Sequence, residues 1–283
     1  MLITLLHKLI RSSFGRLGIQ SNYLDLESCR LHFYEFPHVN PTGTVVLVHG
    51  LGTSSSTWIK VFPVLIRSHR VIAMDLPGFG YSSLKPGRSF CTINEHRAAL
   101  ETLVDQVVQD RFVLVGHSFG GWIAAQYASK RPEQVVHLIL INTAGVYYRG
   151  IEDLARLFTV KSKADMRRLL DALWYRYPWY FRPFTAGIFR ELSKRNLNDI
   201  IASVKLTDFL TEELSELKSP VSVLWGRQDK AISSDSVNVI KNYIPSSSIY
   251  FIDRCGHVPQ LECSEAVRRI LTGILSGSRY GLD

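Results

Sequence analysis

Residues 112–122 read FVLVGHSFGGW, and this stretch decides the fold. Four apolar residues typical of a buried strand run into a Gly-x-Ser-x-Gly pattern, and a helical stretch begins near Trp122. A serine on so tight a turn has a strained backbone, which pushes its hydroxyl out above the sheet. Gly116 and Gly120 remove the side chains that would collide with neighbouring backbone. The pattern therefore predicts that Ser118 is a nucleophile.

Runs rich in Val, Ile and Leu recur along the chain and predict the strands of one sheet. Residues 28–36 alternate apolar and polar side chains, which is typical of an antiparallel edge strand. Most of the other runs are apolar on both faces, as strands of a buried parallel sheet are. These runs are residues 44–48, 70–74, 111–115, 137–141, 221–225 and 248–252. Helical stretches such as 93–108 and 122–129 separate them, so the sequence predicts an α/β fold with helices on both faces of a mainly parallel sheet.

The strand pattern stops between residues 147 and 217. Amphipathic helical patterns replace it at residues 153–158, 163–174 and 198–206, which predicts a helical insertion, or cap. The core domain should then comprise residues 23–146 and 218–283. Aromatic residues crowd the middle of the insertion: Trp174, Tyr175, Tyr177, Trp179, Tyr180, Phe181, Phe184 and Phe189. They either form an apolar lid that suits an acyl chain or pack the insertion onto the core.

Residues 1–22 predict an N-terminal amphipathic helix. Its apolar residues fall on one face, with basic residues beside it, so it either lies in a membrane interface or packs on the domain. No apolar run approaches the roughly 20 residues that a membrane-spanning helix requires. The net charge of the chain is +8, and residues 149–195 hold 11 Lys and Arg against 5 Asp and Glu. Peripheral contact of residues 1–16 and the basic cap with anionic membranes therefore stays open, whereas no nucleic-acid motif accompanies the charge and we expect no nucleic-acid partner.

The four cysteines are too few and too scattered to predict a disulfide framework: Cys29, Cys91, Cys255 and Cys263. No pair has zinc-ligand spacing, and we expect neither a metal nor a cofactor. Free thiols packed as small hydrophobic side chains fit a reducing compartment better than an oxidising one. The sequence therefore favours a cytoplasmic protein, and it does not indicate an oligomeric state.

Two loops near the C-terminal end carry the residues that a serine nucleophile requires. WGRQD at 225–229 and CGHVP at 255–259 each follow an apolar strand. Asp229 and His257 should therefore reach the carboxyl edge of the sheet, where Ser118 also emerges. An imidazole must accept the serine proton, and a carboxylate must orient that imidazole and stabilise its charged form. We therefore expect Ser118, Asp229 and His257 to be the catalytic residues.

These motifs resemble those of the α/β-hydrolase family. The resemblance covers about residues 28–148 and 218–272 and leaves the helical insertion unmatched. The order of nucleophile, acid and base along the chain is also the family's order. The turn DLPGFGYS at 75–82 is similar to a family turn that is mostly structural, so neither Asp75 nor Ser82 is expected to be catalytic. The resemblance implies an α/β-hydrolase fold with an inserted helical cap.

Backbone N–H groups should stabilise the oxyanion that forms when the serine attacks a carbonyl group. The loop HGLG at 49–52 resembles the family's oxyanion loop, so we expect the N–H groups of Leu51 and Phe119 to form this pair. Four side chains are expected to contact the substrate: Trp58, Trp174, Trp179 and Val258. For Trp58, packing in the core is an equally good interpretation.

A serine at this turn excludes the dehalogenases and epoxide hydrolases of the family, whose nucleophile is an aspartate. Carbon–carbon bond hydrolases of diketone-like acids resemble this chain around residues 254–257, but they usually carry Trp where this chain has Val258. Bacterial lipases and esterases match the CGHVPQ segment better. We therefore expect an esterase or lipase that cleaves a small-molecule or lipid ester with an apolar acyl group. A carbon–carbon hydrolase, an acyltransferase and a non-catalytic binding protein of the same fold remain alternatives.

Overall fold

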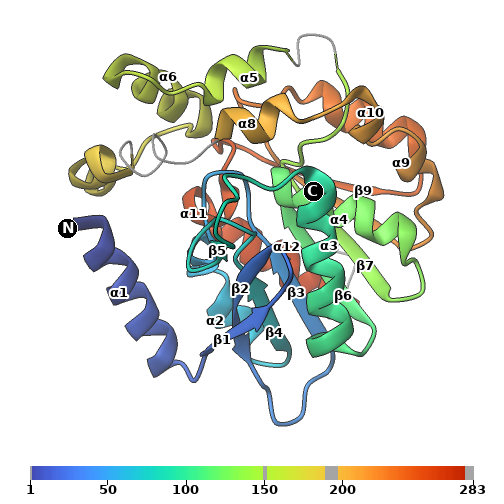
Figure 1. Ribbon diagram of the computed structural model, residues 1–283. Coiled ribbons are helices and arrows are strands. Elements are labelled where there is room, and N and C mark those ends of the chain that lie inside the picture. Colours follow the sequence, from blue (N-terminus) through green and yellow to red (C-terminus); the bar gives the residue numbers. More distant parts are fainter. Residues whose placement is uncertain (1, 149–151, 189–196, 278–283) are drawn as a thin grey trace.

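A nine-stranded sheet forms the centre of the computed structural model, which describes residues 2–148, 152–188 and 197–277 (Figure 1). Its strand order is β1-β2-β4-β3-β6-β7-β8-β9, with β5 paired to β2. The strands are β1 (Gln20–Asp25), β2 (Cys29–Phe36), β3 (Thr44–Val48), β4 (Arg70–Met74), β5 (Ser83–Leu84), β6 (Phe112–His117), β7 (Val135–Ile141), β8 (Val221–Gly226) and β9 (Ser248–Ile252). Strand β2 pairs antiparallel with β1, β4 and β5, and all neighbours from β4 to β9 are parallel. The predicted α/β fold with a mostly parallel sheet is confirmed.

The sheet extends further at its N-terminal edge than the sequence predicted. Strand β2 lies between β1 and β4, so β1 and not β2 is the edge strand. Helix α1 (Leu2–Arg16) ends before Gly18, whose φ of 77° is a left-handed conformation typical of helix ends. The prediction of a helical segment over residues 1–22 was therefore too long. The sequence QSNYLD of β1 has too few apolar residues to show a strand pattern.

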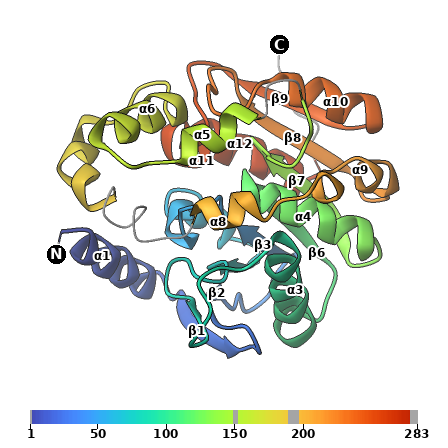
Figure 2. The ribbon, with the colours of Figure 1, turned by 45° about the horizontal axis from the view of Figure 1, so that its top comes forward.

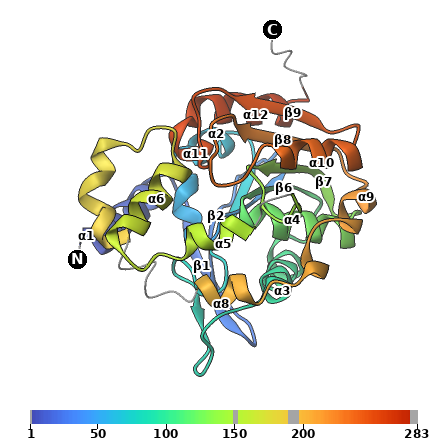
Figure 3. The same ribbon diagram turned by 90° about the horizontal axis from the view of Figure 1, so that it is seen from above.

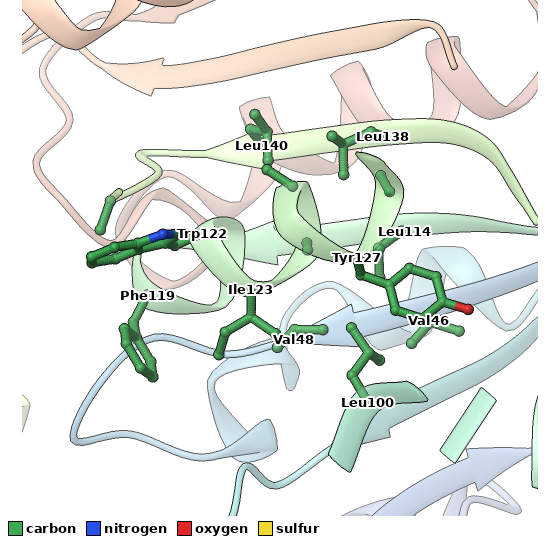
Figure 4. Packing of buried hydrophobic residues seen from close by; sticks show 14 of the residues in the cluster. Val46, Val48, Leu100, Leu114, Phe119, Trp122, Ile123, Tyr127, Leu138 and Leu140 are labelled. Carbon is green, nitrogen blue, oxygen red and sulfur yellow. The ribbon is translucent and has the colours of Figure 1, made fainter. Parts of the chain in front are cut away.

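Helices cover both faces of the sheet, and each face has its own hydrophobic core (Figures 1 and 3). Alternate residues of β3 serve the two cores: Val46 and Val48 face one, and Val45 and Leu47 face the other. The first core contains residues of α3 (Ile93–Leu103), α4 (Phe119–Lys130) and α10 (Asp235–Tyr243). Figure 4 shows Ile123 and Tyr127 of α4 packed in this core. The second core contains residues of α1, α2 (Phe62–Leu65) and α12 (Ser264–Leu275).

Helices occupy the segment between β7 and β8, which we call the insertion (residues 147–217). Among the described residues they include α5 (Glu152–Phe158), α6 (Lys163–Leu173), the 3₁₀ helix η3 (Trp179–Phe184), α8 (Leu197–Ala202), the 3₁₀ helix η4 (Leu206–Asp208) and α9 (Glu212–Glu216). No strand occurs in the described part of the insertion, and α5, α6 and α8 lie over the carboxyl edge of the sheet (Figures 1 and 2). Helix α9 packs against α4. Phe189, the side chains of Tyr180 and Phe181, and the basic residues at 149 and 190–195 lie outside the described residues.

Helix α1 is attached to the core at its C-terminal half. The buried ring of Phe14 lies 4.8 Å from the ring of Tyr34 and 4.9 Å from that of Phe62, between centroids. Leu9, one turn or more before Phe14, is 54% exposed. Neither α1 nor any other described helix has the length and apolar character to cross a membrane. One end of α1 thus packs on the domain, while an apolar residue nearer its start faces outward.

Cys255 and Cys263 form a disulfide, with their Cα atoms 6.1 Å apart. The expectation of four free thiols is wrong for this pair and holds for Cys29 and Cys91, which are free and buried. The eight-residue spacing gave no signal, because the pairing depends on how the loop after β9 folds back. Structural disulfides are typical of oxidising compartments, so this bond does not support the expected cytoplasmic location.

Candidate active site

Ser118 sits on the sharp turn between β6 and α4. Its backbone has φ 52° and ψ −120°, a conformation that side chains rarely adopt. A Cβ atom on Gly116 would collide with the carbonyl oxygen of Gly120, and one on Gly120 would collide with the carbonyl oxygen of His49. The strained turn and the need for both glycines are therefore as the sequence predicted.

Ser118, His257 and Asp229 form one hydrogen-bonded chain at the carboxyl edge of the sheet. His257 Nδ1 lies 2.7 Å from Asp229 Oδ2, and His257 Nε2 lies 2.9 Å from Ser118 Oγ. Because an ionised carboxylate only accepts, Nδ1–H donates to it, which leaves Nε2 as the acceptor for the serine hydroxyl. The loops after β6, β8 and β9 thus bring together the three residues that the sequence singled out.

Asp229 accepts hydrogen bonds from several directions. Its Oδ1 accepts from the N–H groups of Ala231 at 2.8 Å and Ile232 at 3.1 Å, and its Oδ2 also accepts from Asn142 Nδ2 at 2.7 Å. Asn142 follows β7 with φ 43°, and its Oδ1 accepts from the N–H of Gly226 at 3.1 Å. Sequence reasoning missed Asn142, although a polar residue directly after an apolar strand was a signal for it.

Two further histidines support this region without joining the chain. His117 Nε2 donates to the carbonyl of His257 at 2.7 Å, and burial together with the nearby charge of His257 lowers the pKa of His117 to about 3. His117 is therefore a neutral donor at physiological pH. His49 holds the loop before Leu51, since its Nδ1 lies 2.8 Å from the carbonyl of Gly50 and its Nε2 accepts from the N–H of Leu76.

The loop that carries His257 is tied to the insertion by Glu262. The two carboxylate oxygens of Glu262 accept from the N–H groups of Gly256 at 2.8 Å, Tyr175 at 3.2 Å and Arg176 at 2.8 Å. Glu262, Cys255 and Cys263 are the group of potential metal ligands found among the described residues. Their donor atoms do not suit a metal, because the sulfurs are bonded to each other and the carboxylate already holds backbone N–H groups.

Leu51 and Phe119 line the same cavity as Ser118. Phe119 is the first residue of α4, where a backbone N–H has no acceptor within the helix. Leu51 follows Gly50, at which a Cβ atom would lie only 2.8 Å from His117 Nδ1 and 3.2 Å from Ser118 Cβ. The absence of a side chain there lets the loop of Leu51 approach the serine closely.

Ser118 opens into an apolar cavity of ≈ 380 Å³. Apart from the serine and the hydroxyl of Tyr147, its lining side chains are apolar: Leu51, Phe119, Trp122, Ala144, Leu154, Ala155, Phe158, Ile200, Ile201, Val204, Leu206, Phe209 and Ile232. Trp122 is fixed, because its Nε1 donates to the carbonyl of Asp208 at 2.8 Å and its ring stacks on Phe209 with centroids 5.2 Å apart. Figure 4 shows Phe119 and Trp122 side by side near the start of α4. Such a cavity can hold a hydrocarbon chain next to the serine hydroxyl.

None of the four side chains expected to contact the substrate lines this cavity. Trp58 is fully buried in the core that contains α2 and α12, and Trp174 packs with Met166 and Leu170 inside the insertion. Trp179 is 77% exposed, and Val258 is buried before the short helix α11 (Pro259–Glu262). For Trp58 the alternative of packing in the core therefore holds. Trp174 and Trp179 lie away from the cavity because of how the insertion helices pack, which the sequence pattern does not specify.

Trp122, Tyr147 and Phe209 form the aromatic wall of the cavity instead. The rings of Tyr147 and Phe209 meet edge to face, with centroids 5.7 Å apart. A signal existed for Trp122, because it follows Ser118 by four residues and therefore lies on the same side of α4. Residues of the insertion thus complete a cavity that begins at the nucleophile turn.

A model of the alpha/beta hydrolase fold matches residues 43–216, so the chain belongs to the α/β-hydrolase family, and the protein is a hydrolase. It is 28% identical to Lipase 1 of Psychrobacter immobilis, over 77% of this chain and 72% of that protein. It is 27% identical to 2-hydroxy-6-oxo-2,4-heptadienoate hydrolase of Pseudomonas putida, over 82% and 88%. Among solved structures, a membrane phospholipase A superposes with a TM-score of 0.86 at 28% identity, covering 99% of this chain and 93% of that one.

Proposed function

We propose that this hydrolase is a serine carboxylester hydrolase of the lipase and esterase type, acting on esters with an apolar acyl group. One observation carries the proposal: Ser118 Oγ, 2.9 Å from His257 Nε2, opens into an apolar cavity of ≈ 380 Å³. A polar cleft beside the same serine would instead favour a substrate with a polar acyl group. The cavity therefore accounts for the acyl part, and the hydrogen-bonded chain for the bond cleavage.

In the first step, Ser118 Oγ attacks the ester carbonyl carbon while its proton moves to His257 Nε2. Asp229 keeps the imidazole in the required tautomer and stabilises its positive charge. Negative charge collects on the carbonyl oxygen, and we propose that the N–H groups of Leu51 and Phe119, two residues that line the cavity of Ser118, donate to it. His257 then gives its proton to the departing alcohol, and the acyl group remains on Ser118.

In the second step, water replaces the alcohol. His257 Nε2 accepts a proton from the water as its oxygen attacks the acyl carbon, and the same two N–H groups stabilise the second oxyanion. The bond to Ser118 Oγ then breaks, and His257 returns the proton to that oxygen. The products are a carboxylic acid and an alcohol, and an acyltransferase would differ only in the acceptor of this step.

Carbon–carbon bond hydrolysis would use the same residues, and relatives of both kinds match this chain. The likeness to a membrane phospholipase A, at 28% identity and a TM-score of 0.86, supports the proposal of an ester substrate. Val258 also supports an ester substrate, because it occupies the position at which carbon–carbon hydrolases usually carry a tryptophan.

The test is turnover of p-nitrophenyl esters with acyl chains of two to sixteen carbons, without any acceptor alcohol. We expect hydrolysis with a clear optimum of chain length. Trp122→Ala should move this optimum to longer chains, because Trp122 closes one wall of the cavity. Turnover of a dienoate carbon–carbon substrate and of no ester would contradict the proposal, and so would turnover only after addition of an acceptor.

We further propose that the enzyme acts at a lipid surface, through α1 and the basic insertion. Leu9 and Trp179, at 54% and 77% exposed, offer apolar side chains to such a surface, and clustered Lys and Arg attract anionic lipids. The likeness to a membrane phospholipase A supports this reading. Leu9→Glu and Trp179→Ala should each reduce co-sedimentation with anionic vesicles, as should high salt, whereas equal sedimentation of all variants would contradict it. The Cys255–Cys263 disulfide favours a location outside the reducing cytosol.

A further inference from the structure

A second cavity, of ≈ 590 Å³, adjoins the apolar cavity, and Leu154 of α5 lines both. We call it the cationic cavity, because three basic side chains from three elements line it. Arg156 comes from α5, Arg168 from α6, and Lys230 from the loop after β8. Figure 3 shows α5 and α6 next to each other above the sheet. The two cavities thus differ in chemistry although they share a side chain.

The two acidic side chains that line the cationic cavity, Asp153 and Asp229, already have partners within the protein. Asp153 pairs with Arg156 at 3.1 Å, but both side chains are more than three-quarters exposed, and such pairs are weak in water. Asp229 faces its four hydrogen-bond donors. No carboxylate within the described part of the chain forms an ion pair with Lys230. The Lys230 ammonium group and the unused guanidinium N–H groups therefore remain available to an anion.

An ion pair within α6 holds the side chain of Arg168 in place. Arg168 pairs with Asp165 Oδ1 at 2.9 Å, while Asp165 Oδ2 accepts from the hydroxyl and N–H of Ser162 as part of the N-terminal cap of α6. An arginine held by a carboxylate in this way keeps other N–H donors for a second acceptor.

The position of the cationic cavity relates it to the leaving group. Asp229 lines it and is bonded to His257, which protonates the departing alcohol in the proposed reaction. With the acyl chain in the apolar cavity, the alcohol part of the ester extends outside it, and the cationic cavity, which shares Leu154 with the apolar cavity, is an adjoining space that can hold it. We propose, resting on the proposed function, that the cationic cavity binds an anionic group, phosphate or carboxylate, on the alcohol part of the substrate. The enzyme then prefers anionic esters to neutral esters of the same acyl chain.

The experiment compares matched esters. The first pair is 1-octanoylglycerol and its 3-phosphate, and the second is 2-nitrophenyl octanoate and 4-nitro-3-(octanoyloxy)benzoate. The ratio of kcat/KM for the anionic to the neutral member should exceed one in at least one pair. Arg156→Gln, Arg168→Gln and Lys230→Gln should each lower that ratio about two- to fivefold, and salt should lower it too. A loss confined to the first pair identifies phosphate, and one confined to the second identifies carboxylate.

Arg227→Gln is the matched control, because Arg227 also follows β8 but pairs with Asp253 and does not line the cationic cavity. An unchanged ratio in all three variants, or an equal loss in Arg227→Gln, would overturn the proposal. A binding measurement separates this result from failure of the proposed function. Calorimetry on Ser118→Ala should show octyl phosphate binding that is weakened two- to fivefold by an added Arg156→Gln change. If no ester is hydrolysed, the proposed function fails, and this binding difference alone decides whether the cavity takes an anion.

Discussion

The described part of the protein contains two Ser-His-Asp hydrogen-bond chains with the same dimensions. One consists of Ser118, His257 and Asp229, and the other of Ser21, His32 and Asp75. In both, the serine oxygen lies 2.9 Å from Nε2 of the histidine, and Nδ1 lies 2.7 Å from the carboxylate. Only their surroundings differ, so the comparison shows what a serine hydrolase site needs beyond these hydrogen bonds.

The backbone and the free space distinguish the two serines. Ser21 lies in the regular ladder of β1 and β2, opposite Tyr34, whereas Ser118 has φ 52° at the start of α4. The cavity beside Asp75 measures ≈ 10 Å³, against ≈ 380 Å³ beside Ser118. Ser21 lies within a strand, so no helix N-terminus beside it can stabilise an oxyanion. The strained turn and the cavity, rather than the hydrogen-bonded chain, distinguish the proposed catalytic site.

The second chain has a structural role. Asp75 is fully buried and accepts from His32, from the N–H and hydroxyl of Ser55, and from the N–H of Tyr81. Burial alone would raise the pKa of Asp75, but the hydrogen bond and charge of His32 outweigh it and hold that pKa below its ordinary value. Asp75 therefore ties β2, the segment of Ser55 and the turn at Tyr81 together, in agreement with its expected structural role.

The largest difference should appear when each serine is replaced by alanine. Ser118→Ala should lower kcat/KM for a p-nitrophenyl ester by about 10⁴- to 10⁶-fold with the fold intact, because only the nucleophile is lost. Ser21→Ala should retain wild-type turnover. Steady-state kinetics and circular dichroism on both variants check this. A large loss of kcat/KM in Ser21→Ala would contradict the assignment of catalysis to Ser118 alone.

Replacing the two acids should give opposite kinds of damage. Asp229→Asn should lower kcat at least about a hundredfold, because His257 loses the group that fixes its tautomer. Asp75→Asn should instead lower the free energy of unfolding by about 3–5 kcal/mol, since it breaks a buried pair, while folded molecules keep their turnover. Urea unfolding and active-site titration measure the two effects separately. Loss of kcat without loss of stability in Asp75→Asn would contradict this division.

A smaller effect should follow from the donor that only the first chain has, Asn142. Asn142→Gly keeps the left-handed backbone but removes the hydrogen bond to Asp229, and we expect kcat to fall about tenfold with little change in KM. Asn142→Ala should lose as much kcat and, in addition, stability, because alanine strains that backbone. Full activity of Asn142→Gly would show that the hydrogen bond from Asn142 to Asp229 does not contribute to kcat.

The last effect leaves turnover aside and concerns acid stability. Burial, aided by His49, lowers the pKa of His96 to about 3, and burial likewise lowers that of His117 to about 3. Between their ordinary value of 6.5 and 3, the unfolded chain binds these protons and the folded protein does not, so stability falls as the pH falls. Asp75, with a depressed pKa, keeps its contribution above its ordinary 3.8 and loses it only at lower pH.

His96→Leu tests this window. Both ring nitrogens of His96 are buried without a partner in the described part of the chain, so the change removes no hydrogen bond seen there. The loss of stability between pH 6.5 and 5 should shrink in the variant, by up to about 1.4 kcal/mol for each pH unit. Denaturant titrations at several pH values measure it. An unchanged pH slope would mean that His96 is not the group responsible.

The sequence predicted what local geometry determines. Ser118, Asp229 and His257 each follow a strand within a few residues, so their meeting at one edge required only a parallel sheet. The apolar strands were predictable for the same reason, whereas the half-exposed β1 was not. Features formed by residues far apart in the sequence were not predicted.

The substrate cavity shows this limit most clearly. Trp122, Tyr147 and Phe209 line it, while Trp174 and Trp179, which the aromatic pattern favoured, do not. An amphipathic helix shows that one face is buried but not what it is buried against. The Cys255–Cys263 bond was missed likewise, because it depends on the return of one loop onto α11.

Covalent trapping compares the two serines most directly. The protein is treated with a fluorophosphonate, which phosphonylates a serine only where an adjacent base and oxyanion donors activate it, and the adduct is located by peptide mass spectrometry. We predict one adduct per chain, on Ser118, with none on Ser21 and none in Ser118→Ala. An adduct on Ser21, or no adduct on the wild-type protein, would contradict the account.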